Sequence, residues 1–569
     1  MKTLKNKTQP KQPNITVQRI CTALVLITAL LPAVASANHQ SAPGPRPSAI
    51  SAQIEAQLAS LPTSANNAAL RKAYAARGNY PAWVGGERQT ERLLALGARL
   101  SQASEDGLDP AQFRAPSMPS AHATAASLAQ IELHATATLL RFEQDLRGTS
   151  AAALKLHSGP LAKPVATDAE LLLARAAVAT DMAEHLSKLG PQNHFYTGLK
   201  KSLVNYRALR TAGGWQGLTS RARLKPGMRH AGVRALRERL YASGDLLDVA
   251  FDSDWYDDTL SEAVKRFQTR NGLDADGDIG PLTQRALRQS TDDRINQLLV
   301  NMERARWLGD SLGERFVVVN VPGFELEVRE GERIALEMDV IVGRKRRSTP
   351  SYSSAVTRLE FNPYWGVPDS IARKDILPKL QNDPGYLAGL RIYHKGQGYP
   401  YVELGRYSVD WETLASDEPF PYYFRQDPGP ANALGQVKFL FDNPYNVYLH
   451  DTPSQELFAR ASRAFSSGCI RMERPIAMAQ YLLSTQAGWD EGRIQDALDA
   501  GKNLRLELNQ PIKVHLVYQT AWLDKDGVVQ FRADIYSRDR KLARFVAESR
   551  FNPALDLGAQ AALEKNPGT

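Results

Sequence analysis

The hydrophobic pattern of this 569-residue chain changes near residue 315, from the composition of helices to the alternation of strands. From about residue 51 to 217 the sequence is rich in Ala and Leu and poor in β-branched runs, which favours helices. Beyond the change, residues 324–329 alternate strictly between apolar and charged side chains, as in a strand with one buried face. A chain of this length can bury several cores, so we predict a multidomain α+β protein.

The first predicted domain, residues 51–217, is all-helical. Its clearest helix is 168–189, where Thr167 and Glu170 fit a capping box at the start and Gly190-Pro191 end the helix. Five histidines of this domain are scattered without metal-ligand spacing: His122, His134, His157, His185 and His194. We interpret the domain as a structural scaffold.

A second unit is predicted at residues 224–290. Apolar residues at helical spacing predict an amphipathic helix: Leu260, Ala263, Val264 and Phe267. The Asp- and Gly-rich run 274–280 invites comparison with a calcium-binding loop. However, Ile279 and Arg285 stand where the turn glycine and the bidentate glutamate are required, so a tight turn is the better interpretation.

A linker helix at 291–314 leads into a mainly β domain, predicted at 315–546. Within that domain Glu330 to Arg333 should form a hairpin turn into a strand at 334–342. An insert at about 368–424 is rich in Pro, Gly and Tyr, and we predict a lid with short helices at 371–380 and 384–390. Residues 547–569 have the polar composition of a disordered tail.

The first 37 residues have the composition of a secretory signal peptide. Five cationic and no acidic residues precede a 12-residue, mostly apolar run at 20–31, followed by Ala35-Ser36-Ala37. We therefore expect an exported protein without a stable membrane span; a retained anchor is the alternative. A flexible leader at 38–50 should follow. Cleavage lowers the formal charge from +9 to +4, which gives no support for nucleic acid as a partner.

Cys469 would be the only cysteine left after export, because Cys21 lies in the signal segment. A lone thiol in an oxidising compartment cannot close an internal disulfide, which favours a functional role. Cys469 follows Ser466, Ser467 and Gly468 and lies 19 positions after His450. A thiol with a histidine base is the minimal equipment for acyl transfer. The alternative is a small buried hydrophobic residue.

Residues 446–450 read as a strand, on which Tyr448 and His450 would share one face. If Cys469 lies there, His450 can form a thiolate–imidazolium pair with it and lower the pKa of the thiol. Gly468 allows an unusual φ that suits amides aimed at an oxyanion. Arg471 could bind a carboxylate or brace the loop, and Tyr448 could act in catalysis or simply pack.

Other chemistries have little support. One cysteine and scattered histidines do not supply a zinc site. There is no Gly-x-Ser-x-Gly elbow, no papain-type cysteine motif and no phosphate-binding glycine loop with its lysine. The sequence therefore predicts no cofactor and no metal.

Two segments resemble known families. Residues 267–273 and 276–283 resemble the small three-helix peptidoglycan-binding domain. His450, followed after 15 residues by Ser466-Ser467-Gly468-Cys469-Ile470-Arg471, resembles the YkuD-type L,D-transpeptidases, and in particular their large YcbB-like members. Many members carry His at the place of Ser467. The likeness extends to the segments 342–350, 362–365 (Asn-Pro-Tyr-Trp365) and 425–435.

The resemblance implies attack on the bond between diaminopimelate 3 and D-Ala 4 of a tetrapeptide stem, followed by transfer to a neighbouring stem as a 3→3 cross-link. Cys469 would be the nucleophile and His450 the base, with amides at Gly468 and Cys469 holding the oxyanion and Tyr448 as a further candidate donor. Arg471, Ser467, Ser466 and Trp365 would shape the substrate pocket. Partners would be peptidoglycan stem peptides, glycan strands and carbapenem-type inhibitors. L,D-carboxypeptidase action, D-amino-acid exchange and a non-catalytic wall-binding scaffold are the alternatives.

Overall fold

The computed structural model describes residues 46–150, 167–218, 222–247, 252–386, 389–396, 402–414 and 420–549. The predicted signal segment, most of the leader and most of the tail lie outside these residues. The predicted leader is wrong at its end, because a helix begins at Pro47 and Ile50 is fully buried. At the other end the last helix continues to Ser549, three residues into the predicted tail.

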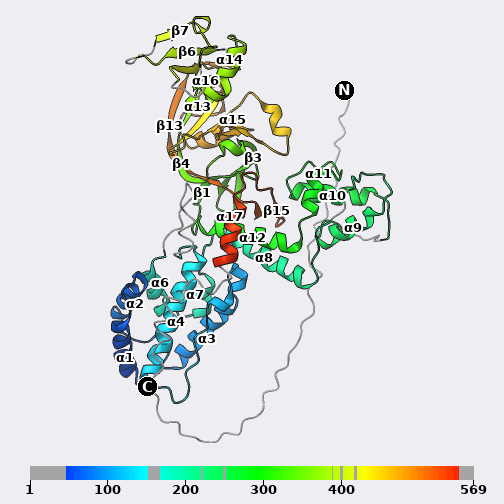
Figure 1. Cartoon of the computed structure of the whole chain (residues 1–569). Coiled ribbons are helices and arrows are strands. Elements are labelled where there is room, and N and C mark those ends of the chain that lie inside the picture. The colour runs from blue at the N-terminus through cyan, green and yellow to red at the C-terminus, as the bar shows by residue number, and fades with distance from the viewer. Residues whose placement is uncertain are drawn as a thin grey trace, which may run out of the picture. The chain divides into compact units, whose positions relative to one another are not determined.

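The predicted all-helical domain is confirmed as a bundle with its own core (Figure 1). Its helices are α1 (Pro47–Ser60), α2 (Ala65–Ala75), α3 (Glu87–Ser101), α4 (Ala125–Leu146), α6 (Ala169–Val178) and α7 (Met182–Ser187). The single helix predicted at 168–189 is wrong. Asp168, not Thr167, caps α6, and the Asp181 carboxylate accepts from the Glu184 amide at 2.9 Å to begin α7. A second capping side chain therefore starts a new helix where periodicity alone indicated one.

The next region is also helical, as predicted. It contains α8 (His194–Thr211), the three-helix unit α9 (Gly232–Ala242), α10 (Asp258–Arg270) and α11 (Pro281–Leu287), and the linker helix α12 (Thr291–Arg306). The four apolar residues predicted to line one face of α10 are all fully buried, which confirms that face. Ser290 and Asp293 form a capping box at the start of α12.

A nine-stranded mixed sheet forms the centre of the C-terminal region, in the order β11-β3-β12-β10-β9-β4-β13-β1-β2. Its strands are β1 (Arg315–Asn320), β2 (Glu325–Glu330), β3 (Arg333–Gly343), β4 (Tyr352–Phe361), β9 (Val437–Phe441), β10 (Leu449–His450), β11 (Ala464–Ser466), β12 (Ile470–Met472) and β13 (Leu504–Val517). The predicted β2–β3 hairpin is confirmed, with Leu326 and Val328 fully buried. Four more elements complete the region: α15 (Pro475–Leu483), α16 (Glu491–Asp499), the β14 (Ala521–Leu523)–β15 (Val529–Phe531) hairpin and α17 (Asp539–Ser549).

The predicted strand at 446–450 is shorter than expected. Only Leu449 and His450 join the ladder, because the Asn443 side-chain oxygen accepts from the amides of Tyr445 and Val447 and folds the chain into a turn. Asn446 has φ +52° in this turn. The predicted alternation nevertheless holds: Val447 and Leu449 are buried in the core, whereas Tyr448 and His450 share the other side.

Phe439 of β9 is fully buried and lies directly opposite both Leu449 of β10 and Leu359 of β4. We expect Phe439→Ala to lower the free energy of unfolding by about 3–5 kcal/mol, because it removes a large side chain from a closed core. Urea unfolding followed by circular dichroism measures this. The exposed Val528→Ala is the control, expected within about 0.5 kcal/mol of wild type. Equal effects of both substitutions would contradict this account of the core.

The insert contains a helical segment and a small sheet. α13 (Asp369–Ile371), the π-helical turn η5 (Ala372–Ile376) and α14 (Leu377–Asn382) confirm the helix predicted at 371–380. The helix predicted at 384–390 is wrong in its described part, because residues 384–385 form a turn and Leu390 begins a strand; residues 387–388 lie outside the described residues. The sheet order is β5-β8-β6-β7, from β5 (Trp365–Gly366), β6 (Leu390–His394), β7 (Val402–Leu404) and β8 (Tyr422–Gln426). These strands pair across long loops, a pattern that local sequence does not reveal.

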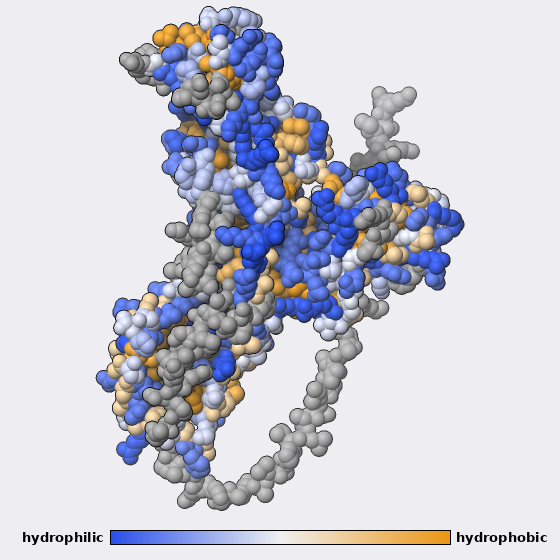
Figure 2. Space-filling model, viewed as in Figure 1, coloured by the Kyte–Doolittle hydropathy of each residue, from blue (hydrophilic) through white to orange (hydrophobic). Residues whose placement is uncertain are grey.

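The surface of the described residues is mainly hydrophilic. On the visible face, hydrophobic side chains form small groups among hydrophilic ones (Figure 2). None of the described helices combines the length and the hydropathy needed to cross a bilayer.

Candidate active site

A cavity of about 430 Å³ opens where β10 and β12 meet the insert. Its walls include Tyr448 and His450 from the β10 segment, Cys469 and Arg471 from the β12 segment, and Trp365 from β5. The predicted Ser466 and Ser467 also line it. The structure thus brings together seven of the eight residues singled out in the sequence, and the eighth, Gly468, lies in the same loop.

The strand register explains why four of these side chains face the cavity. β10 and β12 run parallel, with Leu449 opposite Ile470 and His450 opposite Arg471. Side chains alternate along a strand, so residues 448 and 450 share one face with residues 469 and 471. The apolar partners, Leu449 and Ile470, are fully buried on the opposite face. Burial of Leu449 and Ile470 therefore determines that the side chains of residues 448, 450, 469 and 471 point to the opposite face, toward the cavity.

His450 is held as a neutral base. The ring is only 4% exposed, and its Nδ1 lies 2.5 Å from the Asp451 carbonyl oxygen. A carbonyl oxygen can only accept, so Nδ1 carries the proton and Nε2 keeps a free lone pair. Burial, with the nearby Arg471 charge, lowers the pKa of His450 to about 3.

Burial favours the thiol form of Cys469 over the thiolate. Burial raises its pKa, although hydrogen bonds from Tyr448 and the charges of Lys438 and Arg471 act in the opposite direction. The Sγ atom lies 3.8 Å from the Asn446 carbonyl oxygen. Burial acts against charge on both members of the predicted thiolate–imidazolium pair, since it raises the pKa of the thiol and lowers that of the imidazole. The pair stays a prediction.

The loop before Cys469 is tightly held. Gly468 has φ +122°, which confirms the predicted unusual backbone. Its N–H donates to Ser466 Oγ at 3.1 Å, and Ser466 Oγ donates to the Cys469 carbonyl at 2.5 Å. Thr349 Oγ1 donates to the Gly468 carbonyl at 2.8 Å. The Gly468 amide and the Ser466 hydroxyl are thus engaged within the loop, which leaves them less suited to the predicted contacts with substrate.

The structure adds a bridge that the sequence did not indicate. Arg347 donates through Nη1 to Ser467 Oγ at 2.9 Å and also pairs with Asp375 of the insert. Arg344 pairs with the same carboxylate at 2.8 Å. Although burial alone would raise the pKa of Asp375, its bonds to Arg347 and Arg344 hold that pKa below the ordinary value. The sequence contains one signal for this bridge: the run of four cationic residues at 344–347 favours an acidic residue nearby in the fold.

The rate constant for reaction of Cys469 with an acylating reagent should be nearly constant between about pH 5 and about pH 8. A His450 pKa of about 3 keeps the base neutral throughout this range, and the raised pKa of Cys469 keeps the thiol protonated. The number of protons on the pair therefore does not change. Intact-mass measurement of adduct formation against pH checks this. A fall in rate centred near pH 6.5 would contradict it.

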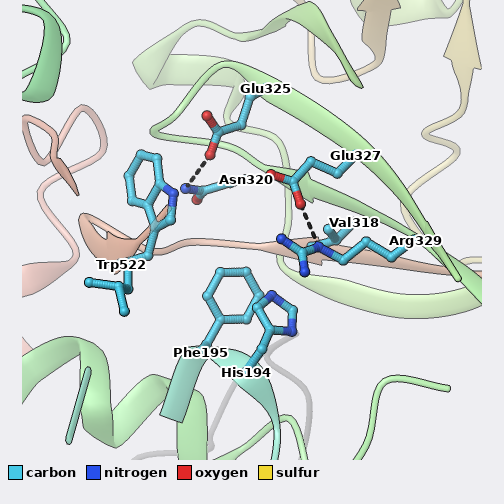
Figure 3. Close-up of a pocket in the computed structure, with 9 residues that line it drawn as sticks. His194, Phe195, Val318, Asn320, Glu325, Glu327, Arg329 and Trp522 are labelled. Atoms are coloured by element: carbon cyan, nitrogen blue, oxygen red, sulfur yellow. Dashed lines mark hydrogen bonds and ion pairs between the residues drawn. The ribbon is translucent and has the colours of Figure 1, made fainter. Parts of the chain in front are cut away.

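A smaller cavity lies between α8, β1, β2 and β14 (Figure 3). Its volume is about 10 Å³, roughly the space of one water molecule. Glu327 pairs with Arg329 at 2.6 Å, and Asn320 donates to Glu325 at 3.4 Å. Burial, above all, lowers the pKa of the adjacent His194 to about 3. This cavity is too small to admit a peptide.

Comparison with known families agrees with this assignment. Residues 314–495 match YkuD, described as the L,D-transpeptidase catalytic domain. Residues 68–203 match a "Scaffold domain", and residues 229–287 match a "Putative peptidoglycan binding domain". The chain therefore contains a YkuD-type L,D-transpeptidase catalytic domain together with a peptidoglycan-binding domain and a scaffold domain.

One curated relative is a "Putative L,D-transpeptidase" from Haemophilus influenzae, which is 35% identical over 254 residues. The match covers 44% of this chain, and the chain spans about half the length of that relative. Among solved structures, an L,D-transpeptidase from Xylanimonas cellulosilytica is 16% identical, with 52% of this chain and 98% of that chain covered and a TM-score of 0.17. One from Stackebrandtia nassauensis is 13% identical, with 53% and 97% covered and a TM-score of 0.19. TM-scores this low give no further support.

Proposed function

We propose that this protein is a peptidoglycan L,D-transpeptidase that forms 3→3 cross-links through a thioester on Cys469. The observation that carries the proposal is that Cys469, His450, Tyr448 and Arg471 line one cavity from two neighbouring parallel strand segments. The match of residues 314–495 to the catalytic domain supports the same reaction class. We further propose that the protein is exported and works at the cell wall of the periplasm.

In the first half-reaction, Cys469 Sγ attacks the carbonyl carbon of diaminopimelate 3 in a tetrapeptide stem. His450 Nε2 takes the thiol proton as the C–S bond forms. The C–N bond to D-Ala then breaks, and His450 returns the proton to the leaving amine. Because the Gly468 amide is engaged by Ser466, the Cys469 amide and the Tyr448 hydroxyl are the better donors to the oxyanion. Burial raises the pKa of Tyr448, which keeps its hydroxyl protonated.

In the second half-reaction, a side-chain amine of a neighbouring stem attacks the thioester carbonyl. The C–N bond forms, the C–S bond breaks, and the sulfur regains a proton through His450. Water in place of the amine would release a tripeptide, and a free D-amino acid would exchange with D-Ala. Trp365 and Ile371 of the insert wall the cavity, which favours the amine by restricting water.

Arg471 is suited to bind a carboxylate of the donor stem. Its Nε is buried without a hydrogen-bond partner among the described residues, and the side chain lines the cavity. A buried donor without a partner is costly, and a carboxylate bound in the cavity would accept a charge-assisted hydrogen bond from Arg471. Residues 229–287 would retain the enzyme on peptidoglycan glycan strands.

Intact-mass analysis tests the proposal directly. The purified protein is mixed with a disaccharide-tetrapeptide, and separately with a carbapenem, and then quenched in acid. We expect one adduct per chain, mapped to Cys469, with the mass of the stem less D-Ala in the first case. Absence of any adduct on folded protein, with both reagents, would contradict the proposal and leave a wall-binding scaffold as the remaining alternative.

A further inference from the structure

A third cavity, of about 500 Å³, is lined by five cationic residues: Arg344, Lys345, Arg346, Arg347 and Lys374. We name it the basic cavity. Four of these residues come from the turn after β3, which includes a short helical segment at Lys345–Arg347, and the fifth comes from η5 of the insert. A concave surface that concentrates one sign of charge attracts ligands of the opposite sign.

The protein itself neutralises only part of this charge. Asp375 pairs with both Arg344 and Arg347. Lys345 donates to the Ser537 hydroxyl, which carries no charge. Arg346 and Lys374 are exposed, and within the described part of the chain neither has an ion pair or a hydrogen bond from its side chain. Five cations with one carboxylate leave a strong preference for an anionic ligand, and two cations are available to bind it directly.

The basic cavity adjoins the cavity that contains Cys469. Arg344 lines both, and Asp375, which orients Arg344 and Arg347, lines the Cys469 cavity. Arg347 also bonds the hydroxyl of Ser467, two residues before the nucleophile. A ligand bound in the basic cavity would therefore lie beside the thioester rather than at a remote surface.

We propose that the basic cavity binds carboxylates of the acceptor stem peptide and thereby places its amine at the Cys469 thioester. This inference rests on the proposed function and adds the place where the second substrate is held. The acceptor must present an amine to the acyl group and also carries free carboxylates. A volume of this size accommodates a short peptide segment. Arg346 and Lys374 would contact the carboxylates, whereas Asp375 would hold Arg344 and Arg347 in position.

The test compares the double variant Arg346→Gln/Lys374→Gln with the matched control Lys201→Gln/Lys502→Gln, whose lysines are exposed and lie outside both cavities. Acylation by a tetrapeptide donor is followed by intact mass. Dimer formation is then followed against acceptor concentration, with a free-acid acceptor stem and with one whose carboxylates are amidated. We expect acylation by the test variant within about twofold of wild type. Its half-saturating concentration of free-acid acceptor should rise about tenfold or more.

The amidated acceptor tests whether the carboxylates carry the effect, and the Lys201→Gln/Lys502→Gln control tests for a general effect of the protein's charge. Wild type should bind the amidated acceptor about tenfold more weakly than the free acid, and the test variant should show little further loss. An equal loss for both acceptors, or an unchanged half-saturating concentration, would overturn the inference. Wild-type protein that does not form the thioester would overturn the proposed function and this inference with it, so the two failures are distinguishable.

Discussion

Cys469→Ala should abolish acyl transfer, with the turnover of tetrapeptide reduced at least about 10⁴-fold. The reaction cannot form a thioester without the sulfur atom, and the remaining groups of the site supply only binding and oxyanion stabilisation. Because Cys469 faces the cavity and is not part of the buried apolar layer, its replacement should leave the fold intact. Release of D-Ala measures the loss.

Two comparisons make this result specific. Binding of the variant to purified sacculi should remain at the wild-type level, since the peptidoglycan-binding match lies at residues 229–287. Cys469→Ser should retain at most a trace of activity, because the hydroxyl is a weaker nucleophile beside a base of such low pKa. Turnover by Cys469→Ala above about a tenth of wild type would exclude Cys469 as the nucleophile.

His450→Gln should reduce the rate of Cys469 acylation by about 10²–10⁴-fold. The neutral thiol has a raised pKa, so attack near neutral pH depends on removal of its proton by Nε2. Glutamine can keep a hydrogen bond to the Asp451 carbonyl but cannot accept the proton. Single-turnover acylation by a carbapenem, followed by intact mass, measures the effect.

The pH dependence of this variant provides an internal check. Without the base, the residual rate should rise with pH toward the pKa of the thiol, whereas the wild-type rate should stay flat. His230→Gln replaces an exposed histidine far along the chain and should behave as wild type. A His450→Gln variant with a wild-type rate and a flat profile would show that another group deprotonates Cys469.

Much of the site could be predicted because its determinants are local. The alternation around Leu449 and the small residues before Cys469 are both visible within a few positions. Parallel pairing of the two strands then places His450 opposite Arg471 and on the same face as Cys469. Helices α10 and α12 were predictable for the same reason, since a periodic apolar face is also a local signal.

The electrostatic state of the site was not predictable from the sequence. A cysteine–histidine pair by itself indicates a thiolate, but burial raises the pKa of Cys469, and burial together with the charge of Arg471 lowers the pKa of His450. The pKa values of both groups depend on how deeply the strands are buried, and only the assembled sheet determines that depth. The extended pairing within the insert escaped prediction because β5 and β8 are separated by more than fifty residues.

The bridge from Asp375 through Arg347 to Ser467 is likewise invisible locally, because Arg347 and Ser467 are 120 positions apart. It ties a helical turn of the insert to the loop that carries Cys469. The lid role of the insert stays a prediction.

The most direct test of the central claim is tandem mass spectrometry of muropeptides after incubation of the purified protein with disaccharide-tetrapeptide. The account predicts a dimer linked between two diaminopimelate residues, one D-Ala released per cross-link, and neither product with Cys469→Ala. Tripeptide alone at every acceptor concentration, or a dimer that forms equally with Cys469→Ala, would contradict it.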